Sequence, residues 1–443
     1  MTITNQRLQV HLDFGLGEEP LLLGECLWYG GKKVAAFEWS QQALGSGLRL
    51  SPLHMPLSPG VLMAKPGPFG GLHGMLSDSI PDGFGLRLMN KSFVAAGLSL
   101  DSITPVHRLA WVGKGGLGAL TFTPVLLAED PRALMDIAEL GVHAAKADVE
   151  NFADIPEAAI KAGGSAHGAR PKFWAAVHKG GKKIILGDHT DIPTDFSSCL
   201  VKFAPAKGDK NEPFYEAACL ELAGKHGVKA ATGRLLRHPN GVALAVDRFD
   251  RMPGGGRKFI QSLAALLNDD FRFPKLDYIH LFQVSQTLSV TPEAERVYRQ
   301  ACFNVALSMK DDHSKNFAFC MDKQGQWELS PAFDLCPNEG PSGWHTMTVS
   351  DVGHRIDRGH LLKFAEKMGL PPAVASDGID KALSAASEFE ALAISLGSEK
   401  AGANRWAKRF KEIGNGLAKP MVPVGSQAPA KKRSRDKPLG PSL

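Results

Sequence analysis

The sequence predicts an α+β protein with a β-rich N-terminal subdomain and a core of two lobes, the second mainly helical. The first 125 residues are rich in glycine, proline and short alternating runs, which favour strands and tight turns. A second strand-rich block follows residue 172, and helical spacing of apolar residues prevails after about residue 275. At 443 residues the chain is also too long for one ordinary core.

Strand and turn signals follow one another in the N-terminal region. LWYGGKKVAAFEW predicts two strands joined by a turn at Gly30-Gly31, and LRLSPLHMPL (48–57) predicts another strand. Pro81-Asp82-Gly83 predicts a turn that precedes a helix. WVGKGGLGALTFTP (111–124) predicts a strand, a glycine turn and a second strand.

The pattern changes near residue 131. PRALMDIAELGVHAAKA (131–147) and the stretch around PEAAIKAG have helical spacing and good helix formers. FWAAVHKGGKKIILG then predicts a hairpin with its turn at Gly180-Gly181, and SCLVKFAP predicts a further strand. A helix over about Glu212 to His226 and strands in GRLLRHPNGVALAVDRFDR complete this part.

The second half of the chain is expected to be mainly helical. Residues 275–310 have helical character, the polar loop KDDHSKN follows, and two strands then lead into AFDLCP, with helices after residue 360. The predicted units are 1–125, the β-rich N-terminal subdomain; 126–265, a first lobe; 266–418, a helical second lobe; and 419–443, a disordered basic tail.

Composition limits the class of protein. Apolar residues make up 44% and charged residues 22% of the chain, as in ordinary globular proteins. No run approaches the roughly 18 apolar residues of a membrane span, and we find no signal-peptide pattern. The six cysteines form no CxxC pair, which indicates reduced thiols and a cytoplasmic protein.

The formal net charge of +5 is mild, and part of it lies in the basic run Lys431 to Lys437. Such a run on a disordered tail is usually a solvated segment. Contact with nucleic-acid phosphates, DNA included, is the functional alternative.

The loop Asp311-Asp312-His313-Ser314-Lys315-Asn316 carries the strongest chemical signal. Protein kinases place a catalytic aspartate five residues before a metal-binding asparagine, and Asp311 and Asn316 have that spacing whereas Asp312 does not. Asp311 is therefore the predicted base and Asn316 a predicted metal ligand, and Lys315 could neutralise the transferring phosphoryl group. A polar turn of the same composition is the structural alternative.

A second carboxylate follows this loop. Asp334 in LSPAFDLCP comes after an apolar run and before a proline turn, where a kinase has its second metal ligand, although the usual glycine after it is absent. An aspartate that only initiates a turn is equally compatible with this pattern.

Lys202 lies in the apolar run CLVKFAP and resembles the lysine of the kinase V-A-I-K strand. A buried ammonium is costly unless it is paired, so we expect Glu216, on the next helix, to be its partner. A lysine exposed at a sheet edge is the alternative.

Glycines precede the predicted strand at residue 173. The segment Gly163 to Lys172 includes Gly164, Ser165 and Gly168, and such a loop lets backbone N–H groups approach phosphate oxygens. One glycine cluster is weak by itself. The order along the chain is more specific: glycine loop, strand lysine, helix glutamate, D-x-x-x-x-N and then aspartate, which is the order of a two-lobed kinase.

At this point the sequence resembles the HipA-type serine/threonine kinases, toxins of type II toxin–antitoxin systems. The resemblance is carried by SxxGxxxK (Ser165, Gly168, Lys172), the LVKF strand, VDRFDR (Asp247 to Arg251), DxHxKNF and LxPxxD. The N-terminal LWYGGKKV, DSIPDGFG and GLGAL segments are similar to the same family. The similarity extends to about residue 400.

The resemblance implies a protein-kinase-like core joined to the N-terminal subdomain, with ATP and Mg²⁺ as cofactors. Lys202 would contact the ATP phosphates, Asp311 would be the base, and Asn316 and Asp334 would bind magnesium. The remaining implied nucleotide-binding residues are Glu216, Gly168, Lys172, His313, Asp247 and Phe249, the last two at the adenine side, where the family usually has glutamate in place of Asp247.

The resemblance also implies regulation and partners. Ser165 would match the family's autophosphorylated serine, whose modification expels the phosphate loop and silences the enzyme. Family members arrest bacterial growth by phosphorylating translation components, notably an aminoacyl-tRNA synthetase, and a DNA-binding antitoxin commonly neutralises them. This chain departs from the pattern at Arg170-Pro171, at Asp312, where a small residue is common, and in its basic tail.

Two other functions stay open at the sequence level. A lipid or small-molecule kinase could share the D-x-H-x-x-N loop, and peptide and lipid acceptors would distinguish the two. A catalytically inactive nucleic-acid-binding protein is the second alternative, and tight, salt-sensitive DNA binding without ATP binding would favour it.

Overall fold

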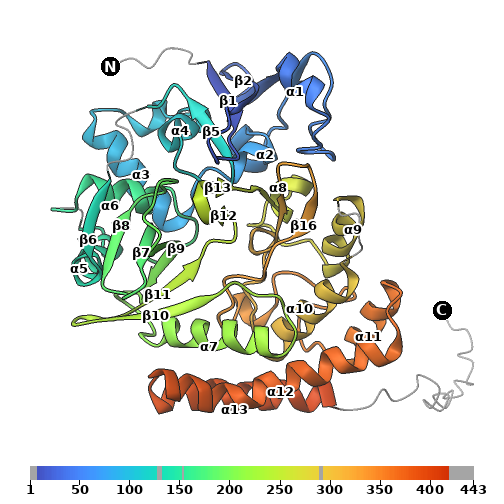
Figure 1. Ribbon diagram of the computed structural model, residues 1–443. Helices are drawn as coiled ribbons and strands as arrows, with labels where there is room; N and C mark the ends of the chain where they lie inside the picture. The colour runs from blue at the N-terminus through green and yellow to red at the C-terminus, as the bar shows by residue number, and fades with distance from the viewer. Residues whose placement is uncertain (1–6, 127–131, 152–153, 289–292, 419–443) are drawn as a thin grey trace, which may run out of the picture.

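The computed structural model describes residues 7–126, 132–151, 154–288 and 293–418. Figure 1 shows the N-terminal sheet at the top, a second, larger sheet at the left and the helical half at the right, with two long helices along the bottom. No helix in these ranges is long and apolar enough to cross a membrane.

The N-terminal unit is a five-stranded antiparallel sheet in the order β4-β3-β2-β1-β5. Its strands are β1 (Leu8–Leu12), β2 (Leu21–Tyr29), β3 (Val34–Trp39), β4 (Val61–Met63) and β5 (Leu120–Thr123). Tyr29 pairs with Val34 around the Gly30-Gly31 turn, which confirms the predicted hairpin.

Two predicted strands in this unit are wrong. Residues 48–57 form no strand, and only Ser51 and Met55 make an isolated bridge. Pro52 and Pro56 lack the N–H groups that a strand would donate. Trp111 lies in a helix, α4 (Pro105–Val112), whose N-terminus is set by Pro105 and by a capping box of Thr104 and His107.

Three further helices belong to the N-terminal unit (Figure 1). They are α1 (Gln41–Ser46), α2 (Gly74–Ser77) and α3 (Gly83–Ala95). Helix α3 follows the Pro81-Asp82-Gly83 turn, as predicted, and brings that turn against the glycine-rich segment: the backbone N–H of Phe84 donates to the carbonyl of Gly168 over 2.9 Å.

The second sheet has six strands in the order β10-β11-β9-β7-β8-β6. They are β6 (Ala133–Asp136), β7 (Lys172–His178), β8 (Lys183–Leu186), β9 (Phe196–Phe203), β10 (Gly233–His238) and β11 (Gly241–Asp247). The hairpin at Gly180-Gly181 is confirmed. The prediction of helix from residue 131 is wrong for 133–136, because this segment pairs with β8 at the sheet edge before α5 begins.

Helices cover both faces of this sheet. The helices α5 (Ile137–Asp148) and α6 (Glu157–Gly164) share a hydrophobic core with alternate residues of β7 and β9, such as Phe173 and Val201. Helix α7 (Glu212–Lys225) packs on the opposite face, in a core that includes Leu244. Since side chains alternate along a strand, Lys202 points to the α7 side.

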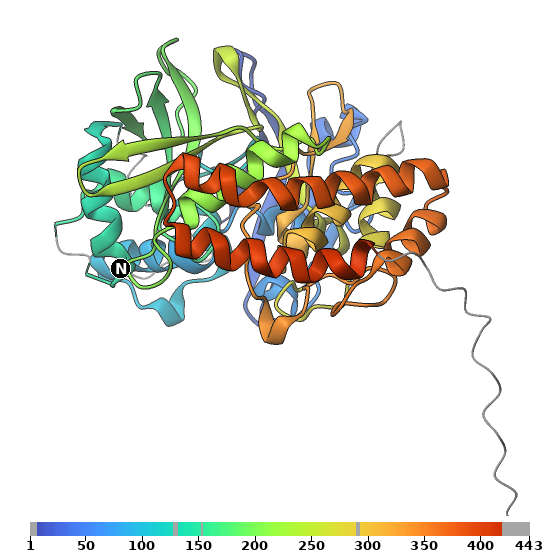
Figure 2. The same ribbon diagram turned by 90° about the horizontal axis from the view of Figure 1, so that it is seen from below.

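The helical half surrounds a small sheet in the order β14-β15-β16. Its elements are β14 (Phe259–Ser262), β15 (Ala318–Met321), β16 (Trp327–Leu329), α8 (Leu263–Leu267), α9 (Tyr278–Leu288), α10 (Ala294–Ala306), α11 (Arg358–Lys367), α12 (Pro372–Leu396) and α13 (Lys400–Ala418). Figure 2 shows α12 and α13 side by side across the molecule. Aromatic contacts join them, such as Phe389 to Phe410 with centroids 5.1 Å apart.

A buried ionic network joins the N-terminal unit to the core. Arg248 makes an ion pair of 2.8 Å with Asp188 and one of 2.5 Å with Asp250, and its guanidinium lies 4.0 Å from the Trp174 ring centroid. Asp250 also accepts from the Gly118 N–H at 2.9 Å. The VDRFDR segment therefore binds the glycine turn before β5.

All six cysteines lie in described residues and none forms a disulfide. Five are buried and Cys336 is half-buried.

Candidate active site

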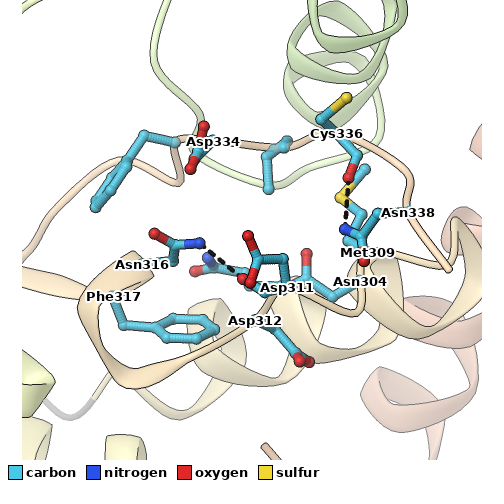
Figure 3. A pocket seen from close by; sticks show the side chains of 12 residues that line it. Asn304, Met309, Asp311, Asp312, Asn316, Phe317, Asp334, Cys336 and Asn338 are labelled. Atoms are coloured by element: carbon cyan, nitrogen blue, oxygen red, sulfur yellow. Dashed lines mark hydrogen bonds between the residues drawn. The ribbon is translucent and has the colours of Figure 1, made fainter. Parts of the chain in front are cut away.

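A pocket lies between the loop after α10 and the loop after β16. Figure 3 shows Asp334 on one side, with Asp311 and Asn316 on the other. The lining residues are Gln300, Asn304, Met309, Asp311, Asp312, Asn316, Phe317, Phe333, Asp334, Leu335, Cys336 and Asn338. Three of the predicted catalytic or metal-binding residues thus share one pocket.

Asp311 and Asp312 have different surroundings. The side chain of Asp311 is 67% exposed, whereas that of Asp312 is fully buried. Asp312 accepts from the Tyr278 hydroxyl at 2.9 Å, from the Thr346 N–H at 2.8 Å, and pairs with His345 at 2.8 Å. Asp312 therefore supports the loop, and Asp311 is the carboxylate that a ligand can reach.

The Asn316 side chain is oriented by the same loop. Its Nδ2 donates to the backbone carbonyl of Asp311 over 2.7 Å. The carbonyl oxygen of Asn316 is then the atom left to bind a cation. The fixed five-residue spacing brings the two predicted residues together through this bond.

Asp334 reaches the pocket from a loop and not from a strand, because β16 ends at Leu329. Its φ of 56° lies in the left-handed region, which is uncommon for a residue with a side chain. Such strain is often found at functional sites. The predicted strand up to this aspartate is wrong, because the chain turns away after β16.

Lys202 is paired as predicted. Its Nζ lies 2.5 Å from Glu216 Oε1 and 2.6 Å from Asp334 Oδ1. Burial opposes the ammonium form, but Asp334 and Glu216 outweigh it and raise the pKa of Lys202 above its usual value. Lys202 in turn holds the pKa of Asp334 below its usual range. Both groups are therefore charged at neutral pH.

The glycine-rich segment is only partly a loop. Gly163 and Gly164 close α6, and the loop itself begins after them. Gly168 has a φ of 102°, which favours glycine, and the Lys172 ammonium occupies the space that a Cβ there would need. Lys172 pairs with Lys202 across β7 and β9, so both lysines face the pocket side of the sheet.

Burial lowers the pKa of Lys172, although Asp334 and Glu216 act against this. The side chains of Lys172 and Lys202 thus lie beside the carboxylates of Asp334 and Glu216.

Ser165 is 3% exposed. Its hydroxyl donates to the Lys161 carbonyl at 3.3 Å, and its own carbonyl accepts from Trp174 Nε1 at 3.0 Å. The serine is thus held inside the protein in this structure.

His313 and Phe249 lie near the pocket. His313 Nε2 is 3.8 Å from Asp311 Oδ1, and its ring centroid is 5.0 Å from that of Phe271. Phe249 contacts Phe333, the residue before Asp334, with centroids 5.5 Å apart.

The Asp247 side chain points away from Lys202. Asp247 pairs with Cys199 across the sheet, three residues from Lys202 and hence on the other face. Its carboxylate is 2.8 Å from Arg234. Any contact of Asp247 with a ligand beside Lys202 must therefore come from its backbone.

Lys315 does not line this pocket. Its Nζ lies 3.1 Å from Asp82 of the N-terminal unit and 5.1 Å from the Phe271 ring centroid. Asp82 was predicted only as a turn residue. No sequence rule predicts a contact between Asp82 and Lys315, because they lie far apart in the chain. The Pro81-Asp82-Gly83 pattern predicted only a turn.

The environment of Asp311 suits a base. Nearby protein partly desolvates the Asp311 carboxylate and raises its pKa above the usual value; Asp334 and Asp312 add to this, and His313 opposes it. A carboxylate with a raised pKa accepts a proton more readily near neutral pH.

The donor set fits magnesium only together with a ligand. Within the described ranges, no group of three or more His, Cys, Asp or Glu side chains could hold a metal ion. Mg²⁺ in phosphotransfer sites is usually held by one or two carboxylates, with water and substrate phosphates completing its shell. Asp334 and Asn316, which line one pocket, match that arrangement.

The fold and the pocket together define a two-lobed, protein-kinase-like core with an added β-rich N-terminal unit. Residues 164–389 match the HipA-like C-terminal domain, and residues 21–123 match the HipA N-terminal domain. The chain therefore belongs to the HipA family.

The solved structures that are similar to the chain include the following two. A chain of the Shewanella oneidensis MR-1 toxin–antitoxin complex of HipA, HipB and operator DNA is 19% identical, covers 92% of this chain and 95% of its own length, and superposes with a TM-score of 0.66. The Helicobacter pylori proinflammatory kinase CtkA is 12% identical over 51% of this chain and 86% of its own, with a TM-score of 0.38. No curated protein matches the sequence.

Proposed function

We propose that this protein is an ATP-dependent serine/threonine protein kinase of the HipA toxin type. The observation that carries the proposal is the pocket in which exposed Asp311 lies with Asn316 and with Asp334, which is paired to the Lys202–Glu216 couple. Phosphoryl transfer uses a carboxylate at the attacking hydroxyl group, metal ligands, and a cationic side chain at the nucleotide phosphates. Asp311, Asn316 with Asp334, and Lys202 supply one group of each kind.

Each residue then has a defined task. Asp311 accepts or orients the proton of the attacking hydroxyl group. Lys202 and Lys172 bind and neutralise the nucleotide phosphates, and Glu216 keeps Lys202 oriented toward them. Phe249 contributes an apolar surface to the adenine side.

Asn316 and Asp334 would hold magnesium when the nucleotide is bound. The metal would supply charge neutralisation at the phosphate oxygens. Lys202 compensates the charge of Asp334 over 2.6 Å in this structure.

We propose that Ser165 is a site of autophosphorylation and that its modification inactivates the enzyme. The hydroxyl is buried, so the segment must leave its place before phosphate can be added. A dianionic phosphate is too costly to rebury without cationic partners, which keeps the segment out. Mass spectrometry of the ATP-treated protein should find phosphate on Ser165.

We further propose that the acceptor is a bacterial translation component, such as an aminoacyl-tRNA synthetase, and that phosphorylation arrests growth. A DNA-binding antitoxin is the proposed neutralising partner. The similarity to the HipA, HipB and operator DNA complex supports this partner.

Incubation with radiolabelled ATP and magnesium tests the proposal. We expect the wild type to label itself or a protein in a bacterial lysate. Asp311→Ala should lower the labelling by a factor of at least about 10², because the base is lost. The matched control is Asp101→Ala, which removes an exposed aspartate from a short turn of the N-terminal unit.

Labelling by Asp311→Ala at the wild-type rate would remove Asp311 as the base. Transfer to lipid or small-molecule acceptors alone would replace the protein-kinase assignment. If calorimetry finds no ATP binding to the unphosphorylated wild-type protein, the proposed kinase function is refuted.

A further inference from the structure

The carboxylate of Asp82 bonds to two loops of the candidate active site, although it belongs to the N-terminal unit. Oδ1 accepts from the Gly168 N–H at 2.5 Å, and Oδ2 lies 3.1 Å from Lys315 Nζ. Gly168 belongs to the glycine-rich loop and Lys315 to the loop of Asp311 and Asn316. One side chain thus spans both loops from a third part of the chain.

Asp82 does not serve the local role that its position suggests. It is the N-cap residue of α3, where an aspartate usually accepts a hydrogen bond from the first turn. Its side chain makes no such bond here. The carboxylate is therefore committed to long-range contacts.

Close packing holds the α3 N-terminus against the same loop. A Cβ added at Gly83 would lie 2.7 Å from the Gly168 carbonyl oxygen, and one at Gly85 would lie 2.2 Å from that of Ala166. The backbone N–H of Phe84 donates to the Gly168 carbonyl. Gly168 is consequently bonded to the N-terminal unit through both its N–H and its C=O.

The ion pair between Asp82 and Lys315 balances a buried positive charge. The Lys315 side chain is only 11% exposed, and a buried ammonium needs a counter-charge. Burial opposes ionisation of Asp82, but Lys315, His167 and the Gly168 N–H outweigh it and hold the pKa of Asp82 below its usual range. Asp82 is the only carboxylate that forms an ion pair with Lys315 among the described residues.

We infer that Asp82 is a positioning residue of the active site, through which the N-terminal unit holds the glycine-rich loop and Lys315 in register with Asp311. This inference rests on the proposed kinase function. It assigns the N-terminal unit a direct part in the reaction, because the unit fixes the glycine-rich loop and a lysine of the loop that carries Asp311 and Asn316. Asp82 itself touches no reacting atom.

Two variants separate the two contacts. Asp82→Asn keeps an oxygen for the Gly168 N–H but removes the charge opposite Lys315, and Asp82→Ala removes both. The control is Asp101→Asn, an exposed aspartate of the same unit. Because Asp82 makes no cap bond, we expect α3 and the thermal midpoint to change little in Asp82→Asn.

The first measurement is hydrogen exchange of the peptide covering residues 165–171 in the nucleotide-free protein, which does not depend on activity. Exchange should be faster in Asp82→Ala and close to wild type in Asp82→Asn and in the control. Unchanged exchange in a folded Asp82→Ala would overturn the contact with the loop.

The second measurement is transfer kinetics. A misplacement of about 1 Å can cost about 10²-fold in rate, so we expect kcat to fall about 10²-fold in Asp82→Ala and by a smaller factor in Asp82→Asn, with a smaller change in KM for ATP. Lys315→Met should add little to the loss in Asp82→Asn, since the two residues act as a pair.

Fully multiplicative losses in the double variant, or wild-type kcat in Asp82→Asn and Asp82→Ala, would overturn the inference. If the wild type transfers no phosphate, the proposed function fails, and the exchange measurement still decides whether Asp82 holds the loop.

Discussion

At the scale of single residues, two adjacent aspartates have opposite roles. Asp311 is exposed in the pocket, while Asp312 is enclosed by the Tyr278 hydroxyl, His345 and the Thr346 N–H. In the sequence, the five-residue spacing to Asn316 identified Asp311, and not Asp312, as the predicted base. The buried bonds of Asp312 give the physical reason for that choice, because a carboxylate with three protein partners is not free to accept a substrate proton.

This difference predicts opposite effects of two conservative changes. Asp312→Asn should lower the free energy of unfolding by about 1–3 kcal/mol, since an amide cannot accept from all three donors and buried groups are left unpaired. Asp311→Asn should change stability by no more than about 0.5 kcal/mol but abolish transfer. Urea unfolding of both variants measures this. Equal stability losses would contradict the assignment of Asp312 as the supporting residue.

At the scale of elements, the site depends on how segments are held together. The VDRFDR segment after β11 binds the glycine turn before β5 through Arg248, Asp250 and Gly118. Lys202 on β9 and Glu216 on α7 are brought together because α7 packs on the face to which Lys202 points. The Lys202–Glu216 pair thus joins a strand of the second sheet to the helix that covers it.

Arg248 offers the test at this scale. Arg248→Met should destabilise the protein by about 3–5 kcal/mol, because it leaves Asp188 and Asp250 buried with fewer counter-charges. Thermal unfolding would measure the loss. Arg132→Met is the matched control, since Arg132 pairs with Asp191 at the surface and such a pair contributes at most about 1 kcal/mol.

A stability loss in Arg248→Met no larger than that in Arg132→Met would show that the network does not join the two units. The six-stranded sheet would then be held to the N-terminal unit by other contacts, such as those of Asp82.

At the scale of the whole molecule, the N-terminal sheet and the helical half share one hydrophobic core. The cluster that includes Leu8 of β1 also includes Phe303 of α10 and Phe389 of α12. A buried hydrogen bond strengthens the contact: the Ser262 hydroxyl donates to Asp78 over 2.8 Å. We therefore expect the N-terminal sheet and the helical half to unfold together.

A core substitution at one end should then be felt at the other. Leu8→Ala should cost about 2–5 kcal/mol and should accelerate hydrogen exchange in α10 as well as in β2. Val61→Ala, on an exposed site of the same sheet, should have little effect. Faster exchange confined to the N-terminal unit would mean that the units unfold independently.

Local sequence patterns determined many elements and the main site residues. Strand alternation, glycine turns and helix formers predicted β2 and β3, the β7–β8 hairpin, α3 and α7, because these depend on neighbouring residues. The fixed spacing from Asp311 to Asn316 predicted their association, and the cost of burying Lys202 predicted its pairing with Glu216. The predicted domain limits and the basic tail stay predictions, and the tail lies outside the described residues.

Only the tertiary structure decided the rest. Residues 133–136 form a strand because they pair with β8 at the edge of the sheet. Asp334 lies in a loop because β16 ends at Leu329. The bond of Asp82 to Gly168 and Lys315 joins residues far apart in sequence, which no local periodicity encodes. Local propensity depends on a few adjacent residues, whereas these contacts depend on where the packing of two sheets and a shared core brings distant segments together.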